Sequence, residues 1–160
     1  MRTQRLIFLL VLAAACGRPF PAFSAGEVPE VSALSAVLLD AATGTVLFEK
    51  NGRVPHPPAS LTKVVTIHLL LEEIAAGRLR PNDEVPVPPE SWASNLPADS
   101  SLMFLGPDQK PRVGDILRGL AVSSGNDAAV AAADLVAGSV GGFTDLMNAE
   151  MLRLGFGDLR

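Results

Sequence analysis

The 160-residue chain is poor in the side chains that build metal centres, disulfides and histidine-based catalytic sites: it has one cysteine, two histidines and no tyrosine. A single cysteine, Cys16, excludes an intramolecular disulfide. No group of His, Cys and Asp residues has the spacing of metal ligands, so we expect neither a metal site nor a cofactor. His56 and His68 do not stand in a recognisable Ser-His-Asp pattern, which argues against that mechanism.

Basic residues are also scarce, with 13 Lys and Arg against 17 Asp and Glu and a formal net charge of −4. The sequence contains no run of basic residues. Proteins that bind nucleic acids use Lys and Arg to neutralise phosphates. The composition therefore argues against a nucleic-acid partner.

Of the few lysines, Lys63 occupies an unusual position. It follows Ser60 by three residues, in Pro58-Ala59-Ser60-Leu61-Thr62-Lys63, where a proline-rich loop gives way to an apolar run. That run ends at Gly77, which predicts a helix over 60–76. Side chains three residues apart on a helix share a face, with Cβ atoms about 5–6 Å apart. The Lys63 amine would therefore lie close enough to take the proton of the Ser60 hydroxyl.

A structural interpretation of the same residues is that Ser60 caps the helix and Lys63 is a solvated surface lysine. The capping box, however, has Glu or Gln where Lys63 stands. The helix dipole also disfavours a cation in the first turn. These two departures favour a chemical role for Ser60 and Lys63.

The N-terminal residues have the pattern of a secretory signal peptide. Arg2 and Arg5 precede an apolar run of about ten residues, which is too short to span a bilayer. We expect residues 1–24 to be removed and residues 25–160 to form part of one exported domain, located in the periplasm or on the outer face of the cytoplasmic membrane. The alternatives are an uncleaved anchor and lipidation at Cys16.

The remaining chain predicts a mixed fold of the α/β (α+β) class. Apolar segments at 33–40 and 45–49, separated by a glycine-containing turn, indicate an antiparallel hairpin. Helical patterns follow a loop over residues 50–58. Residues 78–111 are interrupted by prolines and are predicted to be irregular. The first helix is apolar nearly all round, which predicts burial in the domain centre. The predicted helices cover 60–76, 113–122, 128–136 and 144–154.

A second polar motif, Ser124-Gly125-Asn126, lies between two of these helices. Such residues commonly cap the helix that follows. Beside a serine–lysine pair they could do more: the Ser124 hydroxyl could relay a proton, and the Asn126 amide could orient a substrate carbonyl and the lysine.

From about residue 33 to 155, the order and spacing of these short motifs resemble the low-molecular-mass penicillin-binding proteins, the serine-type D-alanyl-D-alanine carboxypeptidases. The resemblance implies a β-lactamase/transpeptidase-like fold. It also implies that Ser60 is the nucleophile, Lys63 the general base, Ser124 the proton relay and Asn126 a substrate-binding residue. The implied substrate is a peptidoglycan stem peptide ending in D-Ala-D-Ala, with β-lactams as inhibitors.

The family's third motif, a Lys/His/Arg-Thr/Ser-Gly triplet on a downstream strand, does not occur after Asn126, and no lysine follows Lys110. We therefore expect the N-terminal part of a family member, a β-hairpin plus a helical subdomain without the C-terminal strands of the sheet. Such a chain would turn over little or no D-Ala-D-Ala peptide. It would contact a membrane only through a lost downstream anchor or a lipid on Cys16.

Three alternative functions remain. A class A-like β-lactamase is the enzymatic one, although that class normally carries Asp where Gly125 stands. The second is a non-catalytic exported module that binds cell-wall peptide. The third is an exported structural domain in which Ser60 and Ser124 only cap helices.

Overall fold

A computed structural model describes residues 30–156 of the chain. The predicted signal peptide and Cys16 lie outside these residues. The chain divides between Pro55 and His56 into two units, which are described separately here.

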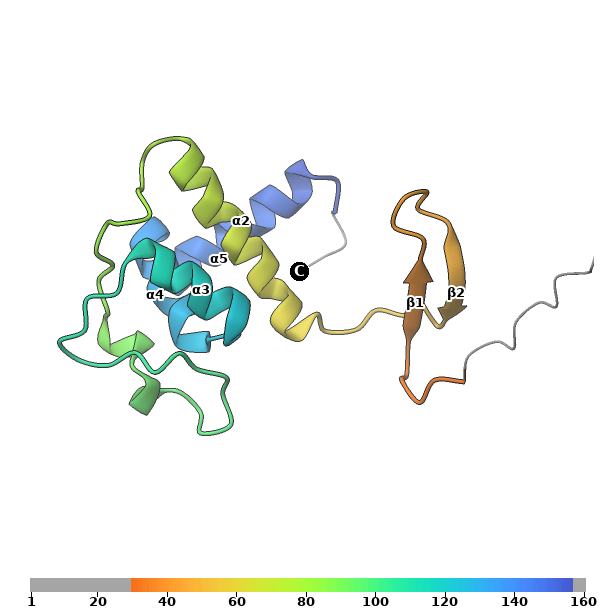
Figure 1. The fold of residues 1–160 in the computed structure, drawn as a ribbon, viewed down its shortest axis with the longest axis horizontal. Helices are drawn as coiled ribbons and strands as arrows, with labels where there is room; N and C mark the ends of the chain where they lie inside the picture. The colour runs from red at the N-terminus through yellow and green to blue at the C-terminus, as the bar shows by residue number, and fades with distance from the viewer. Residues whose placement is uncertain (1–29, 157–160) are drawn as a thin grey trace, which may run out of the picture. The chain divides into compact units, whose positions relative to one another are not determined.

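The first unit is the predicted antiparallel hairpin, formed by β1 (Ala36–Leu39) and β2 (Val46–Lys50) (Figure 1). Leu38 pairs with Phe48, and a bulge follows between Leu38 and Leu39. The Asp40 carboxylate shapes the turn by accepting hydrogen bonds from the backbone and hydroxyl of Thr43, both at 2.8 Å. These bonds lower the pKa of Asp40 below its ordinary value. Local hydrogen bonding therefore forms the turn that the glycine-containing segment predicts.

Most apolar side chains of the two strands are exposed, as at Val37 (50%) and Val46 (51%). Within the first unit, the two strands form a single layer, so the unit itself provides no second layer to cover their apolar side chains.

The second unit is helical, and its helices occur where the sequence predicts them. α2 (Thr62–Ala75) follows a 3₁₀ turn, η1 (Ala59–Leu61), and α3 (Val113–Val122) has the predicted bounds. α4 (Asn126–Ala137) and α5 (Val140–Arg153) begin two and four residues earlier than expected. In residues 30–156 no single helix is long and apolar enough to cross a membrane; only the bent pair α4 and α5 meets that test.

The segment between α2 and α3 is irregular, as its prolines indicate. It contains two short 3₁₀ turns, η2 (Pro89–Ser91) and η3 (Ala93–Asn95), the first packed against α4. The Trp92 indole N–H donates to the Val87 carbonyl at 3.1 Å, which closes the loop on itself.

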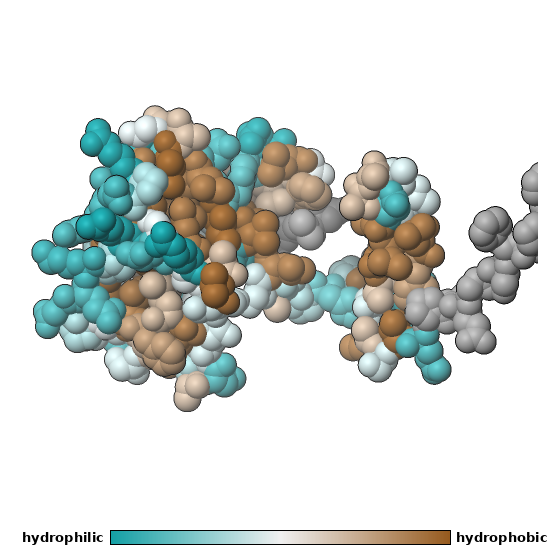
Figure 2. Space-filling model, in the orientation of Figure 1, coloured by the Kyte–Doolittle hydropathy of each residue, from teal (hydrophilic) through white to brown (hydrophobic). Residues whose placement is uncertain are grey.

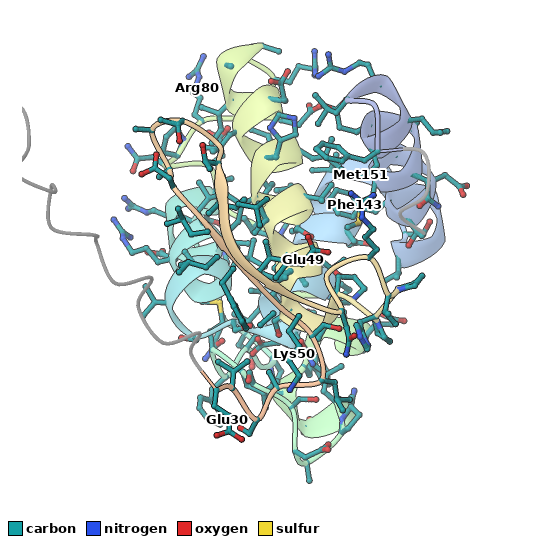
Figure 3. The ribbon with its side chains drawn as sticks, turned by 90° about the vertical axis from the view of Figure 1, so that its right-hand side faces the viewer. Glu30, Glu49, Lys50, Arg80, Phe143 and Met151 are labelled. Carbon is teal, nitrogen blue, oxygen red and sulfur yellow. The ribbon has the colours of Figure 1, made fainter. Side chains whose placement is uncertain are left out.

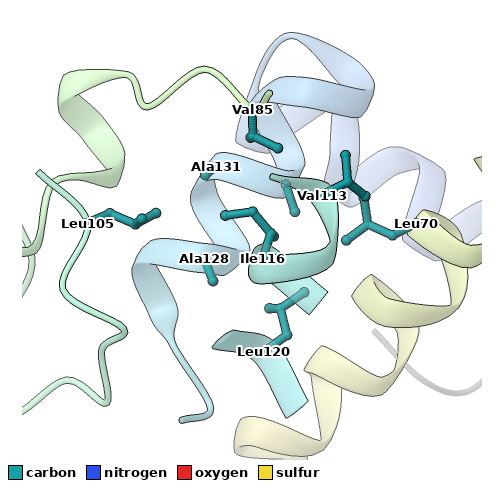
Figure 4. Close-up of a cluster of buried hydrophobic side chains, with 9 residues drawn as sticks. Leu70, Val85, Leu105, Val113, Ile116, Leu120, Ala128 and Ala131 are labelled. Atoms are coloured by element: carbon teal, nitrogen blue, oxygen red, sulfur yellow. The ribbon is translucent and has the colours of Figure 1, made fainter. Parts of the chain in front are cut away.

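The core of the second unit lies where α2, α3 and α4 meet (Figure 4). Leu70 and Ile116 are fully buried there, and α4 contributes a stripe of small side chains that includes Ala128 and Ala131. Because alanine has only a methyl group, the neighbouring helices can pack close to the α4 backbone. The loop adds Val85 to the same cluster.

Only one side of α2 is buried, contrary to the expectation of a helix enclosed in the domain centre. Thr66 and Leu70 are its buried residues, whereas Val64 is 62% exposed and Leu61, directly before the helix, is 71% exposed. Figure 2 shows apolar atoms gathered along this helix. Apolar residues on all sides allow a helix to be buried on all sides. They do not determine how many neighbouring elements pack against it.

A polar contact joins α2 to α5 near the end of the unit. His68 Nε2 lies 2.8 Å from Glu150 Oε1, and Arg153 donates two further hydrogen bonds to the same carboxylate. On α5, Phe143 and Met151 lie on the side that faces α2 (Figure 3). His68 is thus a hydrogen-bonded residue between two helices.

Replacing Leu70 by Ala should lower the free energy of unfolding by about 2–5 kcal/mol, because it removes a fully buried side chain and leaves a cavity between α2 and α3. The neighbouring Leu71, which is 49% exposed, provides the matched control. Leu71→Ala should change stability by no more than about 0.5 kcal/mol. Urea denaturation measures both, and equal losses in the two variants would contradict the described packing.

The stability of the fold should also depend on the charge of Glu150. The hydrogen bonds from Arg153, and then from His68, lower the pKa of Glu150 to about 2. Because this is below the ordinary value of 4.5, the carboxylate stabilises the fold fully above pH 4.5, and the stabilisation is lost as the pH falls toward 2.

As the pH is lowered from roughly 5 to 2, the unfolding temperature of the wild type should therefore fall more steeply than that of Glu150→Gln. Asp145→Asn on the same helix is the control, and it should keep the wild-type slope. Parallel pH curves for the wild type and Glu150→Gln would show that the ion pair does not form in solution.

Candidate active site

The site begins where the chain enters α2. Ser60 lies in the 3₁₀ turn η1 and is exposed, and Lys63 is half-buried in the first turn of the helix. The Lys63 Nζ and Ser60 Oγ atoms are 3.4 Å apart. Ala59, just before Ser60, has a positive φ of 47°. A non-glycine residue in this region is strained, and such strain is often found beside functional groups.

Asn126 completes this cluster from the other side. It is the first residue of α4, and its Oδ1 accepts a hydrogen bond of 2.7 Å from Lys63 Nζ, across 63 residues of sequence. The amide oxygen offers the Lys63 Nζ group a hydrogen-bond acceptor at the N-terminus of α2, where the backbone offers only N–H donors. The structure thus brings together Ser60, Lys63 and Asn126, three of the four residues that the motifs predict for the site.

Ser124, the fourth predicted residue, lies in the same turn as Asn126 but is not joined to the cluster. Within residues 30–156 its hydroxyl makes no hydrogen bond to Ser60 or Lys63, and it is not among the residues that line the pocket. Its backbone has a positive φ of 52°. The turn therefore holds Ser124 in a strained conformation two residues from Asn126.

A pocket of about 580 Å³ opens beside Ser60, Lys63 and Asn126. Apart from Lys63, its walls carry no charged side chain. The wall away from Ser60 is apolar and comes from α4 and α5, so a ligand at Ser60 would lie against uncharged surface. The apolar residues of that wall are Ala129, Val130, Ala133, Val140, Phe143 and Met147. In the described part of the chain no three His, Cys, Asp or Glu side chains group closely enough to hold a metal ion.

The structure also reveals a residue that sequence reasoning did not single out. Asp127 is fully buried, and its carboxylate accepts hydrogen bonds from the backbone N–H groups of Met103, Leu105 and Ala128. It thereby attaches the 101–105 segment to the start of α4. The available signal was an acid placed directly before an alanine-rich helix, where a solvated surface acid would be an equally good interpretation.

The Asp127 carboxylate leaves no space for a side chain at Gly125. A Cβ atom built on Gly125 would lie 2.7 Å from Asp127 Oδ1 and 3.2 Å from the Met103 nitrogen. No real Cβ atom tolerates the first distance. The φ of Gly125, −62°, is one that any residue can adopt, so the need for glycine here is one of space.

The arrangement of the helices places the chain among the penicillin-binding protein structures. Penicillin binding protein 5 from Haemophilus influenzae is a similar solved structure, with a TM-score of 0.73 and 36% identity over 79% of this chain and 37% of its own. Penicillin-binding protein D2 from Listeria monocytogenes, solved in an ampicillin-bound form, has a TM-score of 0.65 and 25% identity over 79% of this chain and 48% of its own. The predicted transpeptidase-like fold is confirmed.

The family model described as D-alanyl-D-alanine carboxypeptidase (Peptidase_S11) matches residues 22–160, and the chain belongs to this family. A curated relative, the D-alanyl-D-alanine carboxypeptidase DacA of Escherichia coli K12, is 42% identical over 130 residues. That match covers 80% of this chain and 32% of DacA, so the chain spans about a third of the length of this relative. The resemblance inferred from the short motifs is confirmed.

Removing the Asn126 side chain tests the cluster without any substrate. Asn126→Ala should lower the free energy of unfolding by about 1–3 kcal/mol, because the half-buried Lys63 side chain loses its shortest hydrogen bond. Asn148→Ala, at an exposed position of α5, is the control and should change stability by at most about 0.5 kcal/mol. If both variants unfold at the same urea concentration as the wild type, the 2.7 Å contact is not formed in solution.

Proposed function

We propose that the protein is a serine-type D-Ala-D-Ala carboxypeptidase in which Ser60 forms the acyl-enzyme. The observation that carries this proposal is the position of Lys63 Nζ, 3.4 Å from Ser60 Oγ and 2.7 Å from Asn126 Oδ1. Lys63, in its neutral amine form, acts as the general base that removes the Ser60 proton. The distance between the two groups is long for a hydrogen bond, as is common in sites without substrate, and it shortens when the reacting carbonyl is bound.

In the reaction, Ser60 Oγ attacks the carbonyl carbon of the terminal D-Ala-D-Ala bond and its proton passes to Lys63. Ser124 relays a proton to the departing D-Ala amine, and Asn126 holds the substrate carbonyl and the lysine. Water then hydrolyses the ester on Ser60. The substrate is the peptidoglycan stem peptide, and a β-lactam acylates the same serine because its strained amide takes the place of the peptide bond.

A substrate of this kind lies outside the cytoplasm, which supports export of the chain. The pattern of residues 1–24 fits a signal peptide, and we propose that the protein acts in the periplasm or on the outer face of the cytoplasmic membrane. Gly125 supports a carboxypeptidase over a class A-like β-lactamase, because the Asp of that class at this position would meet the buried Asp127 carboxylate.

The experiment is intact mass spectrometry of the folded chain before and after incubation with benzylpenicillin. We expect a gain of one penicillin, because acylation requires Ser60 and its base but not turnover of a peptide. Lys63→Ala should slow the gain by roughly 10²- to 10⁴-fold, the usual contribution of a positioned base.

Ser60→Ala is the control, and it should gain no mass. A gain that persists in Ser60→Ala would show that another nucleophile reacts. A folded wild-type chain that stays unlabelled would refute the proposal for this chain. The unlabelled mass also reports whether residues 1–24 have been removed.

A further inference from the structure

Asp127 is a fully buried carboxylate that the proposed chemistry does not use. Its Oδ1 accepts from Met103 N at 3.0 Å and from Ala128 N at 2.9 Å; its Oδ2 accepts from Leu105 N at 2.9 Å and from Met103 N at 3.1 Å. Among the described residues, no Lys, Arg or His forms an ion pair with it. Backbone N–H groups and the N-terminus of α4 therefore stabilise this buried charge.

The carboxylate holds together two strained segments. On one side, Met103 and Leu105 flank Phe104, a bulky residue with a positive φ of 66°. On the other side, Ser124 has a positive φ of 52°. Such conformations persist only where the surrounding contacts over-determine them. The hydrogen bonds that the N–H groups of Met103 and Leu105, on both sides of Phe104, donate to Asp127 are contacts of this kind.

These bonds end one residue from the predicted site. Asn126 N donates to the Ser101 carbonyl at 2.8 Å, so its backbone is fixed by the same segment that Asp127 holds. The Asn126 side chain in turn accepts from Lys63 Nζ. A continuous set of hydrogen bonds thus runs from the buried carboxylate, through the 101–105 segment and Asn126, to the lysine beside Ser60.

We propose that Asp127 is the positioning residue of this site: its buried carboxylate fastens the 101–105 segment to α4 and thereby sets the Asn126 amide oxygen against Lys63 Nζ. Asp127 touches neither Ser60 nor Lys63, so it acts only through Asn126. The effect expected on catalysis rests on the proposed function; the effect on Lys63 itself does not.

Asp127→Asn tests this directly. Each carboxylate oxygen accepts two backbone N–H groups, so either orientation of the amide sets an NH₂ group against N–H donors and opens the contact. The first readout is the ¹³Cε resonance of Lys63 in chain labelled with ¹³C-lysine. The sequence has only three lysines, which makes assignment by single substitutions straightforward. We expect the Lys63 resonance to move and those of Lys50 and Lys110 to stay.

Two control variants separate positioning from loss of charge and from loss of stability. Asp115→Asn removes another first-turn acid that accepts a backbone N–H, from Arg112 at 3.0 Å, away from the site. Val113→Ala removes part of a fully buried side chain in α3. Neither should move the Lys63 resonance.

The second readout is the rate and pH profile of Ser60 acylation by benzylpenicillin. In Asp127→Asn we expect the rate to fall on the order of 10- to 100-fold and the pH profile to shift, because the base is misplaced. The two controls should keep both within about twofold of the wild type. If the wild-type chain is not acylated, the proposed function fails, and the Lys63 resonance still decides the role of Asp127.

An unmoved Lys63 resonance in folded Asp127→Asn would overturn the proposal. If that variant does not fold, Gly125→Ala serves in its place, because the added Cβ displaces the Asp127 carboxylate while leaving its charge. Gly125→Ala should move the same resonance, and an unchanged Lys63 there would be equally decisive against the proposal.

Discussion

Two helices begin at the candidate site, and the hydrogen bond between Lys63 of α2 and Asn126 of α4 joins their N-termini. Each N-terminus carries a partial positive charge, so a lysine between them is electrostatically unfavourable on its own. The Asn126 amide oxygen, which accepts a hydrogen bond from Lys63, offsets that cost. The polar residues at the start of α4 therefore support Lys63 in its position beside Ser60.

The packing of the helices brings Lys63 of α2 close to Asn126 of α4. α4 presents Ala128, Ala131 and Ala132 to the core, each with no exposed surface, and α2 inserts Leu70 beside α3. A larger residue on the buried stripe of α4 would push the neighbouring helices outward, because protein cores have no spare volume. The distance between Lys63 and Asn126 is thus coupled to the side-chain volume of residues that never touch the pocket.

The sequence patterns predicted the positions of the helices more accurately than their burial. The bounds of α3 were correct because its apolar period and flanking residues agree. α5 begins at Val140, earlier than expected, because Gly141 and Gly142 weaken the helical signal while Ser139 caps the helix by accepting from Gly142 N. The expected burial of α2 was wrong, since apolar composition says nothing of which neighbours are present. The prediction for the signal peptide concerns residues 1–24, and the structure describes residues 30–156.

The sequence by itself determined the proximity of Ser60 and Lys63, because a spacing of three residues on a helix leaves little freedom, and it determined the family through the order of its short motifs. Tertiary structure alone decided that Asn126, and not Ser124, contacts Lys63, since residues 63 positions apart meet only when whole helices pack. The same holds for Asp127. Its partners are backbone N–H groups of Met103, Leu105 and Ala128, and every residue except proline carries such a group, so no sequence pattern could reveal them.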